Sequence, residues 1–261
     1  MTGNLLHLVR AEWLKASTTK LLWIMVLGAL GFTALNVVAL ILVAPEASAA
    51  LLDIDALQSP EYLTSVLASA SSASLFVLLL GIIAMTGEYR HMTITSTFLA
   101  APRRGRVVLA KGVTYAVMGA AIAVISVAWC TLVAFAVLIG REHAPITAGM
   151  VGSILFGVAL GLAIYAVVGV SVGALIKNQV AAIVIAILWV MLVEPLLSVF
   201  VSGIGKWLPG GALNAAMNVT TQADLTAADV LPVWGGALLL LAYAVVFATV
   251  ASLTTVRRDI T

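Results

Sequence analysis

Six long apolar runs constrain this chain more than any other feature of its sequence. They occupy residues 21–44, 63–86, 112–139, 146–176, 180–201 and 231–256. A helix needs roughly 20 residues to cross a bilayer core of about 30 Å, and every run is longer than that. The strands of outer-membrane barrels alternate in polarity over about 10 residues, so this pattern excludes them. The sequence therefore predicts an all-α integral membrane protein with six transmembrane helices.

The composition supports this class and excludes several others. Hydrophobic residues make up 63% of the 261 residues and charged residues 9%, and the mean hydropathy is +1.18. Soluble domains carry about 25% charged residues. A disulfide scaffold is excluded because Cys130 is the single cysteine. The net charge of +2 is small, so we expect no nucleic-acid partner.

The basic residues predict the orientation in the cytoplasmic membrane. With the N-terminus inside, the cytoplasmic segments carry Arg10, Lys15, Lys20, Arg90, Arg103, Arg104, Arg106, Lys111, Lys177, Arg257 and Arg258. The outer segments then keep only Arg141 and Lys206. This asymmetry predicts that both termini are cytoplasmic. We expect no cleaved signal peptide, because the first apolar run exceeds the roughly 7–15 residues of a signal segment.

The chain is expected to form one membrane domain over residues 1–261. Residues 1–20 are assigned to an interfacial helix, 21–256 to the six-helix domain and 87–111 to a cytoplasmic loop. The longest segment between runs is 202–230, too short for a soluble catalytic domain. No Gly-x4-Gly-Lys-Ser/Thr pattern occurs, so any ATP that drives the protein must bind another chain.

The segment 2–19 has the pattern of an amphipathic helix lying in the headgroup plane. Its apolar side comprises Leu5, Leu6, Leu8, Val9, Trp13 and Leu14, and its polar side Arg10, Glu12 and Lys15. The alternative is a plain cytoplasmic extension of the first span.

The first cytoplasmic loop contains the most informative motif. Glu88-Tyr89-Arg90 opens it, Thr93-Ile94-Thr95 follows, and Pro102 ends any helix before it. Arg103, Arg104 and Lys111 then precede the third span. Taken by itself, this pattern also suits an ordinary basic loop that obeys the topology, and its β-branched residues disfavour a helix.

These residues resemble the loop between spans two and three of ABC-2-type exporter permeases. The resemblance extends to the six spans, the N-terminal helix and the interrupted segment before the last span. It departs at Met92, where the family often has glycine. The resemblance implies a coupling helix that docks on an ATPase, formed in this sequence around Glu88, Tyr89, Arg90, Thr93, Thr97, Pro102, Arg103 and Arg104.

The resemblance also implies a function and a set of partners. The chain would be the membrane subunit of an ABC exporter for a lipophilic compound, lipid, drug or peptide. It would pair with a second permease chain, identical or homologous, within membrane lipids. Two ATPase chains would bind ATP and magnesium, and this chain would hold no metal or cofactor. The alternatives are a non-transporting regulatory or immunity component and a standalone secondary transporter.

Four glycines in the fourth run are candidates for close helix packing. Gly157 and Gly161 form one Gly-xxx-Gly pair, and Gly169 and Gly173 form another. Small residues at this spacing let two helix backbones approach in lipid. The partner can be a helix of the same chain or one of a second subunit.

Polar residues within the runs are candidates for a gate or a pathway. Ser69 and Ser72 lie in a serine-rich stretch of span two, and Asn36 lies in span one. Glu194 is the only carboxylate inside a run, and Pro195 after it predicts a broken helix. Pro209-Gly210-Gly211 then predicts a short re-entrant or interfacial hairpin before span six. A capping box at Thr226–Asp229 is predicted at the N-terminus of span six.

One hydrolase-like pattern is present, but its general base is missing. Gly169-Val170-Ser171-Val172-Gly173 matches the elbow of serine hydrolases. His7, His91 and His143 all lie outside the runs, so none can activate Ser171 within span four. We therefore expect no catalytic site in this chain.

Overall fold

The computed structural model describes residues 5–43, 56–93, 104–201, 203–217 and 231–251, and within these ranges the chain forms helices and no strand. Six helices are long and apolar enough to cross a membrane: Lys20–Leu42, Pro60–Arg90, Gly105–Leu138, Ala148–Leu175, Gln179–Phe200 and Val233–Val250. The predicted all-α class with six spans is thereby confirmed. The assignment of residues 1–261 to one domain stays a prediction.

The elements follow one another along the described chain in a simple order. The first half contains α1 (Leu5–Thr18), α2 (Lys20–Leu42), η1 (Ala56–Gln58), α4 (Pro60–Ala68), η2 (Ser69–Ala73), α5 (Ser74–Arg90) and α7 (Arg104–Leu138). The second half contains α8 (Ala148–Leu175), α9 (Gln179–Leu188), η3 (Trp189–Val193), α10 (Glu194–Phe200), η4 (Gly205–Trp207), α11 (Pro209–Ala216) and α12 (Val233–Ala251).

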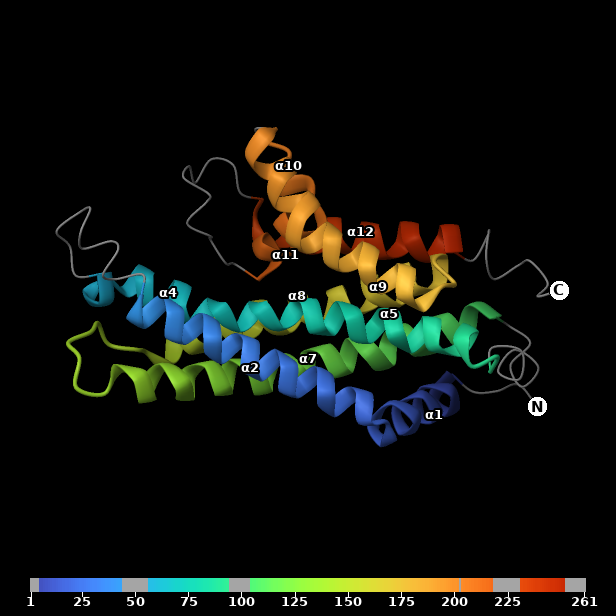
Figure 1. The fold of residues 1–261 in the computed structure, drawn as a ribbon, viewed down its shortest axis with the longest axis horizontal. Helices are drawn as coiled ribbons and strands as arrows, with labels where there is room; N and C mark the ends of the chain where they lie inside the picture. Colours follow the sequence, from blue (N-terminus) through green and yellow to red (C-terminus); the bar gives the residue numbers. More distant parts are fainter. Residues whose placement is uncertain (1–4, 44–55, 94–103, 202, 218–230, 252–261) are drawn as a thin grey trace.

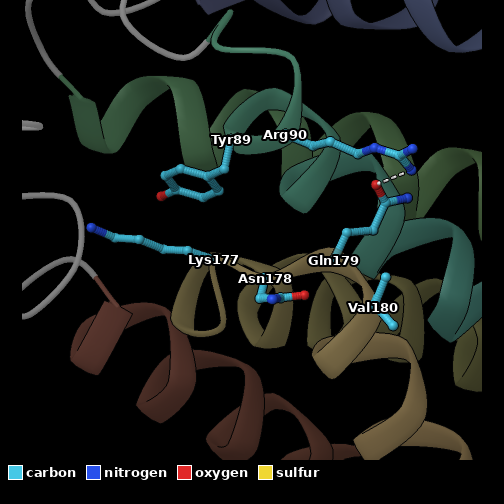
Figure 2. A pocket seen from close by; sticks show the side chains of 6 residues that line it. All are labelled: Tyr89, Arg90, Lys177, Asn178, Gln179 and Val180. Carbon is cyan, nitrogen blue, oxygen red and sulfur yellow. Dashed lines mark hydrogen bonds between the residues drawn. The ribbon is translucent and has the colours of Figure 1, made fainter.

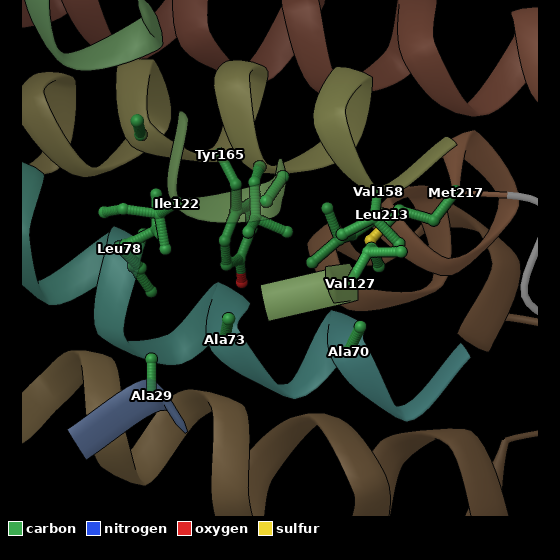
Figure 3. Packing of buried hydrophobic residues seen from close by; sticks show 14 of the residues in the cluster. Ala29, Ala70, Ala73, Leu78, Ile122, Val127, Val158, Tyr165, Leu213 and Met217 are labelled. Carbon is green, nitrogen blue, oxygen red and sulfur yellow. The ribbon is translucent and has the colours of Figure 1, made fainter. Parts of the chain in front are cut away.

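Helix α8 lies at the centre of the bundle. It packs against α5 and α7, and it also contacts α11 and α12, while α1 and α2 pack on α7 (Figure 1). Val158, Leu162 and Tyr165 of α8 are buried, and Figure 3 shows Tyr165 and Val158 among neighbouring apolar side chains. The core is therefore built around the helix that carries the four candidate glycines.

The two ends of the bundle hold different features. Helix α1, the end of α5, the start of α7 and the α8–α9 junction lie at one end, which we call the α1 end (Figure 1). The connection from α7 to α8 lies at the opposite end. This arrangement agrees with the predicted order of crossings, while the side of the membrane on which each end lies stays a prediction.

Two spans depart from regular α-helix geometry. Span two contains the 3₁₀ segment η2, which consists of Ser69, Ala70, Ser71, Ser72 and Ala73. Span five contains the π-helical turn η3 directly before Glu194 and Pro195. Proline has no N–H and its ring clashes with the carbonyl four residues earlier, so a wider turn relieves that contact. The predicted break is therefore a local widening, and the helix continues as α10.

The N-terminal helix forms where the sequence predicts one, but Glu12 does not lie on an exposed polar side. Glu12 is buried at 8% exposure, although it was assigned to the polar side. The reason is a buried partner for Glu12 on α7. Whether α1 lies at the membrane surface stays a prediction.

Candidate functional site

Four charged side chains meet inside the α1 end, and we call them the ion cluster: Glu12, Lys15, Glu88 and Lys111. Lys15 Nζ lies 2.5 Å from Glu88 Oε1, and Lys111 Nζ lies 3.1 Å from the same oxygen. Lys111 also donates a short hydrogen bond to Glu12 Oε2. Two acids and two bases thus balance one another within a single network.

Three helices supply the ion cluster, and its burial makes the pairing important. Glu12 and Lys15 are three residues apart on α1, so they share one helix face. Glu88 comes from the last turn of α5 and Lys111 from the early turns of α7. Glu88 and Lys111 are 2% and 1% exposed. Unpaired charges at such depth are very costly, so the network fastens α1 to both helices.

The C-terminus of α5 is shaped by a turn directly after the ion cluster. Thr93 N–H donates to the Glu88 carbonyl at 3.0 Å, and Met92 N–H donates to the Tyr89 carbonyl at 3.3 Å. These two bonds form a Schellman motif, which places Met92 at the position usually held by glycine. Met92 has φ 56°, in the left-handed region, and its side chain is 76% exposed.

The eight candidate coupling residues do not all lie together. Glu88 belongs to the ion cluster, so its carboxylate faces the interior of the chain. Tyr89 and Arg90 face a cavity beside α9, and Thr93 closes the turn after α5. Thr97, Pro102 and Arg103 lie outside the described residues, as does the predicted coupling helix, and Arg104 begins α7.

The cavity at the α1 end has a volume of about 600 Å³. Figure 2 shows its lining residues: Tyr89, Arg90, Lys177, Asn178, Gln179 and Val180. Arg90 donates a hydrogen bond of 3.2 Å to the side-chain oxygen of Gln179, which joins the end of α5 to the start of α9. The cavity therefore lies between two spans and carries two cationic side chains.

Glu194 holds the start of α11, which follows span five; the re-entrant or interfacial hairpin stays a prediction, and the predicted capping box at Thr226–Asp229 lies outside the described residues. Its Oε1 accepts a short hydrogen bond from Gly210 N–H and another of 3.3 Å from Gly211 N–H. Both donors belong to the first turn of α11, where backbone N–H groups lack helical partners and a negative charge is favourable. Glu194 is 7% exposed, whereas Pro195 beside it is exposed. The carboxylate thus caps α11 from within the bundle.

The four candidate glycines pack on helices of the same chain. A side chain at Gly169 would meet the backbone of Leu78 in α5, and one at Gly173 would meet Ile82. Gly157 and Gly161 lie against Met217, directly after α11. The structure therefore places both Gly-xxx-Gly pairs at contacts inside the chain.

The remaining polar candidates form hydrogen bonds with nearby groups. Asn36 donates to the Phe32 carbonyl of its own helix at 2.8 Å. Ser72 contacts Thr33 of α2 at 3.2 Å, and Ser69 contacts Cys130 of α7 at 3.6 Å. Both serines thus join η2 to neighbouring helices.

The hydrolase-like pattern lies within a continuous helix. Ser171 donates to the Val167 carbonyl at 2.9 Å inside α8. The strand-to-helix turn that exposes a hydrolase nucleophile is therefore not formed around it. Within the described ranges, no group of His, Cys, Asp and Glu residues could hold a metal ion.

Three members of the ion cluster were not predicted as site residues. Amphipathicity and topology alone draw attention to Glu12 and Lys15, while Lys111 is also part of the loop motif before the third span. The sequence does contain one indication of this cluster: acids and bases flank three of the apolar runs on the same predicted side of the membrane. Because their pairing requires three helices to meet, the sequence offers no spacing that predicts it.

Comparison with known families gives one match. A family described as ABC-2 family transporter protein matches residues 8–194, which is more than half of the chain. The matched range includes most of α1, the ion cluster, the cavity and Glu194. No curated protein matches the sequence.

Proposed function

The chain belongs to the ABC-2 transporter family, and on that premise we propose that it is the membrane subunit of an ABC exporter. Members of this family are membrane transport components rather than catalytic enzymes, and the family implies an ABC ATPase partner in general. We propose two ATPase chains that bind ATP and magnesium, with this chain in a dimer with a copy or a homologue. The cargo class is a lipophilic compound, lipid, drug or peptide, exported across the cytoplasmic membrane.

The ion cluster is the observation that supports this function most directly. Its members lie on α1 and on the two helices that flank residues 91–103. A force applied by an ATPase to that segment would reach α5, α7 and α1 together, because buried ion pairs are costly to separate. The cluster thus supplies a stiff connection between a docking surface and the spans.

Met92 provides an accessible point on the proposed docking surface. It lies next to the ion cluster, and its side chain is 76% exposed. Methionine is flexible and polarizable and is common at protein-binding surfaces, so an exposed Met92 suits contact with a protein partner. We propose that the ATPase covers Met92 on the cytoplasmic side of the membrane.

The function is tested by purifying the tagged full chain from its native membranes and identifying its partners. We expect an ATPase with a Walker A loop to co-purify. Met92→Asp should weaken that association at least about tenfold, a loss of roughly 1.4 kcal/mol. Aspartate accepts the left-handed conformation more readily than methionine, so the substitution suits the backbone.

Arg141→Asp is the matched control, because it introduces the same carboxylate at the opposite end, at an exposed position. It should leave the association unchanged. Equal effects of the two variants would contradict the docking surface at Met92. A chain that purifies without any ATPase and does not change cargo efflux would contradict the exporter and favour a regulatory or immunity component.

A further inference from the structure

The cavity beside α5 and α9 has features that the exporter proposal does not use. We propose that it binds the headgroup phosphate of an anionic phospholipid. It lies where one candidate span, Pro60–Arg90, ends and another, Gln179–Phe200, begins. The ends of spans are the level at which lipid headgroups lie.

Two cations in the cavity are available for an anion. Among the described residues, neither Arg90 nor Lys177 forms an ion pair, and the one hydrogen bond of Arg90 is to the neutral Gln179. Glu88, the acid next to Tyr89 in sequence, is neutralised by Lys15 and Lys111. Among the described residues, the cavity therefore carries an excess of positive charge.

Tyr89 supplies a polar atom that lacks a partner. Its hydroxyl is buried and forms no hydrogen bond with any described residue. Figure 2 shows this hydroxyl on the same side of the cavity as the amine of Lys177. Buried hydroxyls almost always have a partner, so this hydroxyl has a hydrogen bond left to make with a group bound in the cavity. A phosphate oxygen accepts a hydrogen bond from a phenol and attracts an ammonium group at once.

An apolar track leads out of the cavity along span five. Val180 lines the cavity and is 68% exposed, and Val184 and Leu188 are 47% and 49% exposed. These residues are four apart, so they form one continuous face of α9. An acyl chain could lie on this face while its headgroup occupies the cavity. The combination of a cationic cavity and an apolar track favours a lipid over a free phosphate.

The test compares lipid retention by the full chain in nanodiscs of phosphatidylcholine with and without phosphatidylglycerol. Native mass spectrometry after transfer to detergent measures the ratio of the two lipids that remain bound. We expect the wild-type chain to be enriched in phosphatidylglycerol. Lys177→Gln should lower that enrichment about fivefold, the factor associated with one lysine beside an anionic headgroup. Tyr89→Phe should lower it as well.

Two comparisons separate a specific site from other effects. Lys20→Gln removes the same charge from an exposed position outside the cavity and should retain the enrichment. In phosphatidylcholine alone, Tyr89→Phe should melt at the wild-type temperature or above it, because the hydroxyl it removes is buried and has no partner among the described residues. Lost enrichment in that variant therefore reports binding rather than misfolding.

Three results would overturn the proposal. Lys177→Gln and Lys20→Gln could lower the enrichment equally, which would leave only general attraction to the membrane surface. Inorganic phosphate could displace the retained phosphatidylglycerol or stabilise the chain equally well in phosphatidylcholine, which would indicate a soluble anion. Lys177→Gln could instead release a co-purifying ATPase with the lipid ratio unchanged, which would indicate a protein-docking surface.

Discussion

At the scale of single residues, Lys111 has the most demanding environment, since it is 1% exposed and faces both Glu12 and Glu88. Lys111→Met should lower the free energy of unfolding by about 3–5 kcal/mol, because it leaves two buried acids with Lys15 alone. Adding Glu12→Gln should recover a large part of this loss, since it removes one of the uncompensated charges. Thermal or denaturant unfolding in one detergent measures both variants.

Lys15→Met is the control for the Lys111→Met substitution. The Lys15 side chain is 49% exposed, so water screens its pairing with Glu88, and its loss should matter much less. If Lys15→Met and Lys111→Met were equally destabilising, the burial of the ion cluster would have no energetic consequence.

Substitutions of Glu194 distinguish a structural role of this carboxylate from a role in gating. Its Oε1 accepts both backbone hydrogen bonds from α11, and a glutamine oxygen can accept the same two. We therefore expect Glu194→Gln to fold and to keep cargo efflux per ATP hydrolysed unchanged, with a stability loss below about 1.5 kcal/mol. Glu194→Ala should lose the cap and about 1–2 kcal/mol.

The decisive measurement is the ratio of efflux to hydrolysis in a reconstituted complex. A folded Glu194→Gln protein that hydrolyses ATP without export would contradict the structural role. It would show instead that the charge itself takes part in opening the pathway.

At the scale of the elements, the contact between α5 and α8 depends on the absence of a side chain at Gly169. An added Cβ would collide with the backbone of Leu78. Gly169→Ala should therefore separate the helices and destabilise the chain by about 1–3 kcal/mol. Gly152 lies on the same helix with open space around it, so Gly152→Ala should be neutral or stabilising by up to about 1 kcal/mol. The difference in melting temperature between the two variants measures the close approach.

The spans could be predicted from sequence because length and apolarity suffice to define a helix in lipid. Their ends could not: α7 begins at Arg104, well before its apolar run, because an α-helix can extend past the bilayer with charged side chains. The 3₁₀ segment η2 was also missed, since hydropathy does not distinguish hydrogen bonds to the third residue from those to the fourth. The left-handed Met92 is a similar case, because backbone angle is set by the surrounding turn.

The candidate site was predicted in part for the same physical reason. Glu88 was selected from a motif, but its partners on α1 and α7 come from distant parts of the chain. The sequence predicts a polar face for Glu12, because an isolated amphipathic helix offers a charged side chain no buried partner. Only the packing of α1 on α7 makes a buried position favourable for that carboxylate.

At the scale of the whole molecule, the distribution of charge predicts the orientation in the membrane. Arg10, Lys20 and Lys177 lie on elements of the α1 end, whereas Arg141 lies at the opposite end. Positive charge is retained on the cytoplasmic side, so the α1 end should face the cytoplasm. Cys130 is fully buried, so it should not react with reagents added to the folded chain.

Two single cysteines test this orientation in intact cells. Arg141→Cys should react with an impermeant thiol reagent from outside, because residue 141 is exposed in the connection between α7 and α8. Met92→Cys, which is as accessible but at the α1 end, should react only after the membrane is permeabilised. Repeating both in a Cys130→Ala background excludes labelling of the native thiol. Labelling of Met92→Cys in intact cells would contradict this orientation and place the α1 end outside. The ATPase surface proposed at the α1 end would then lie outside the cell, where ATP is scarce.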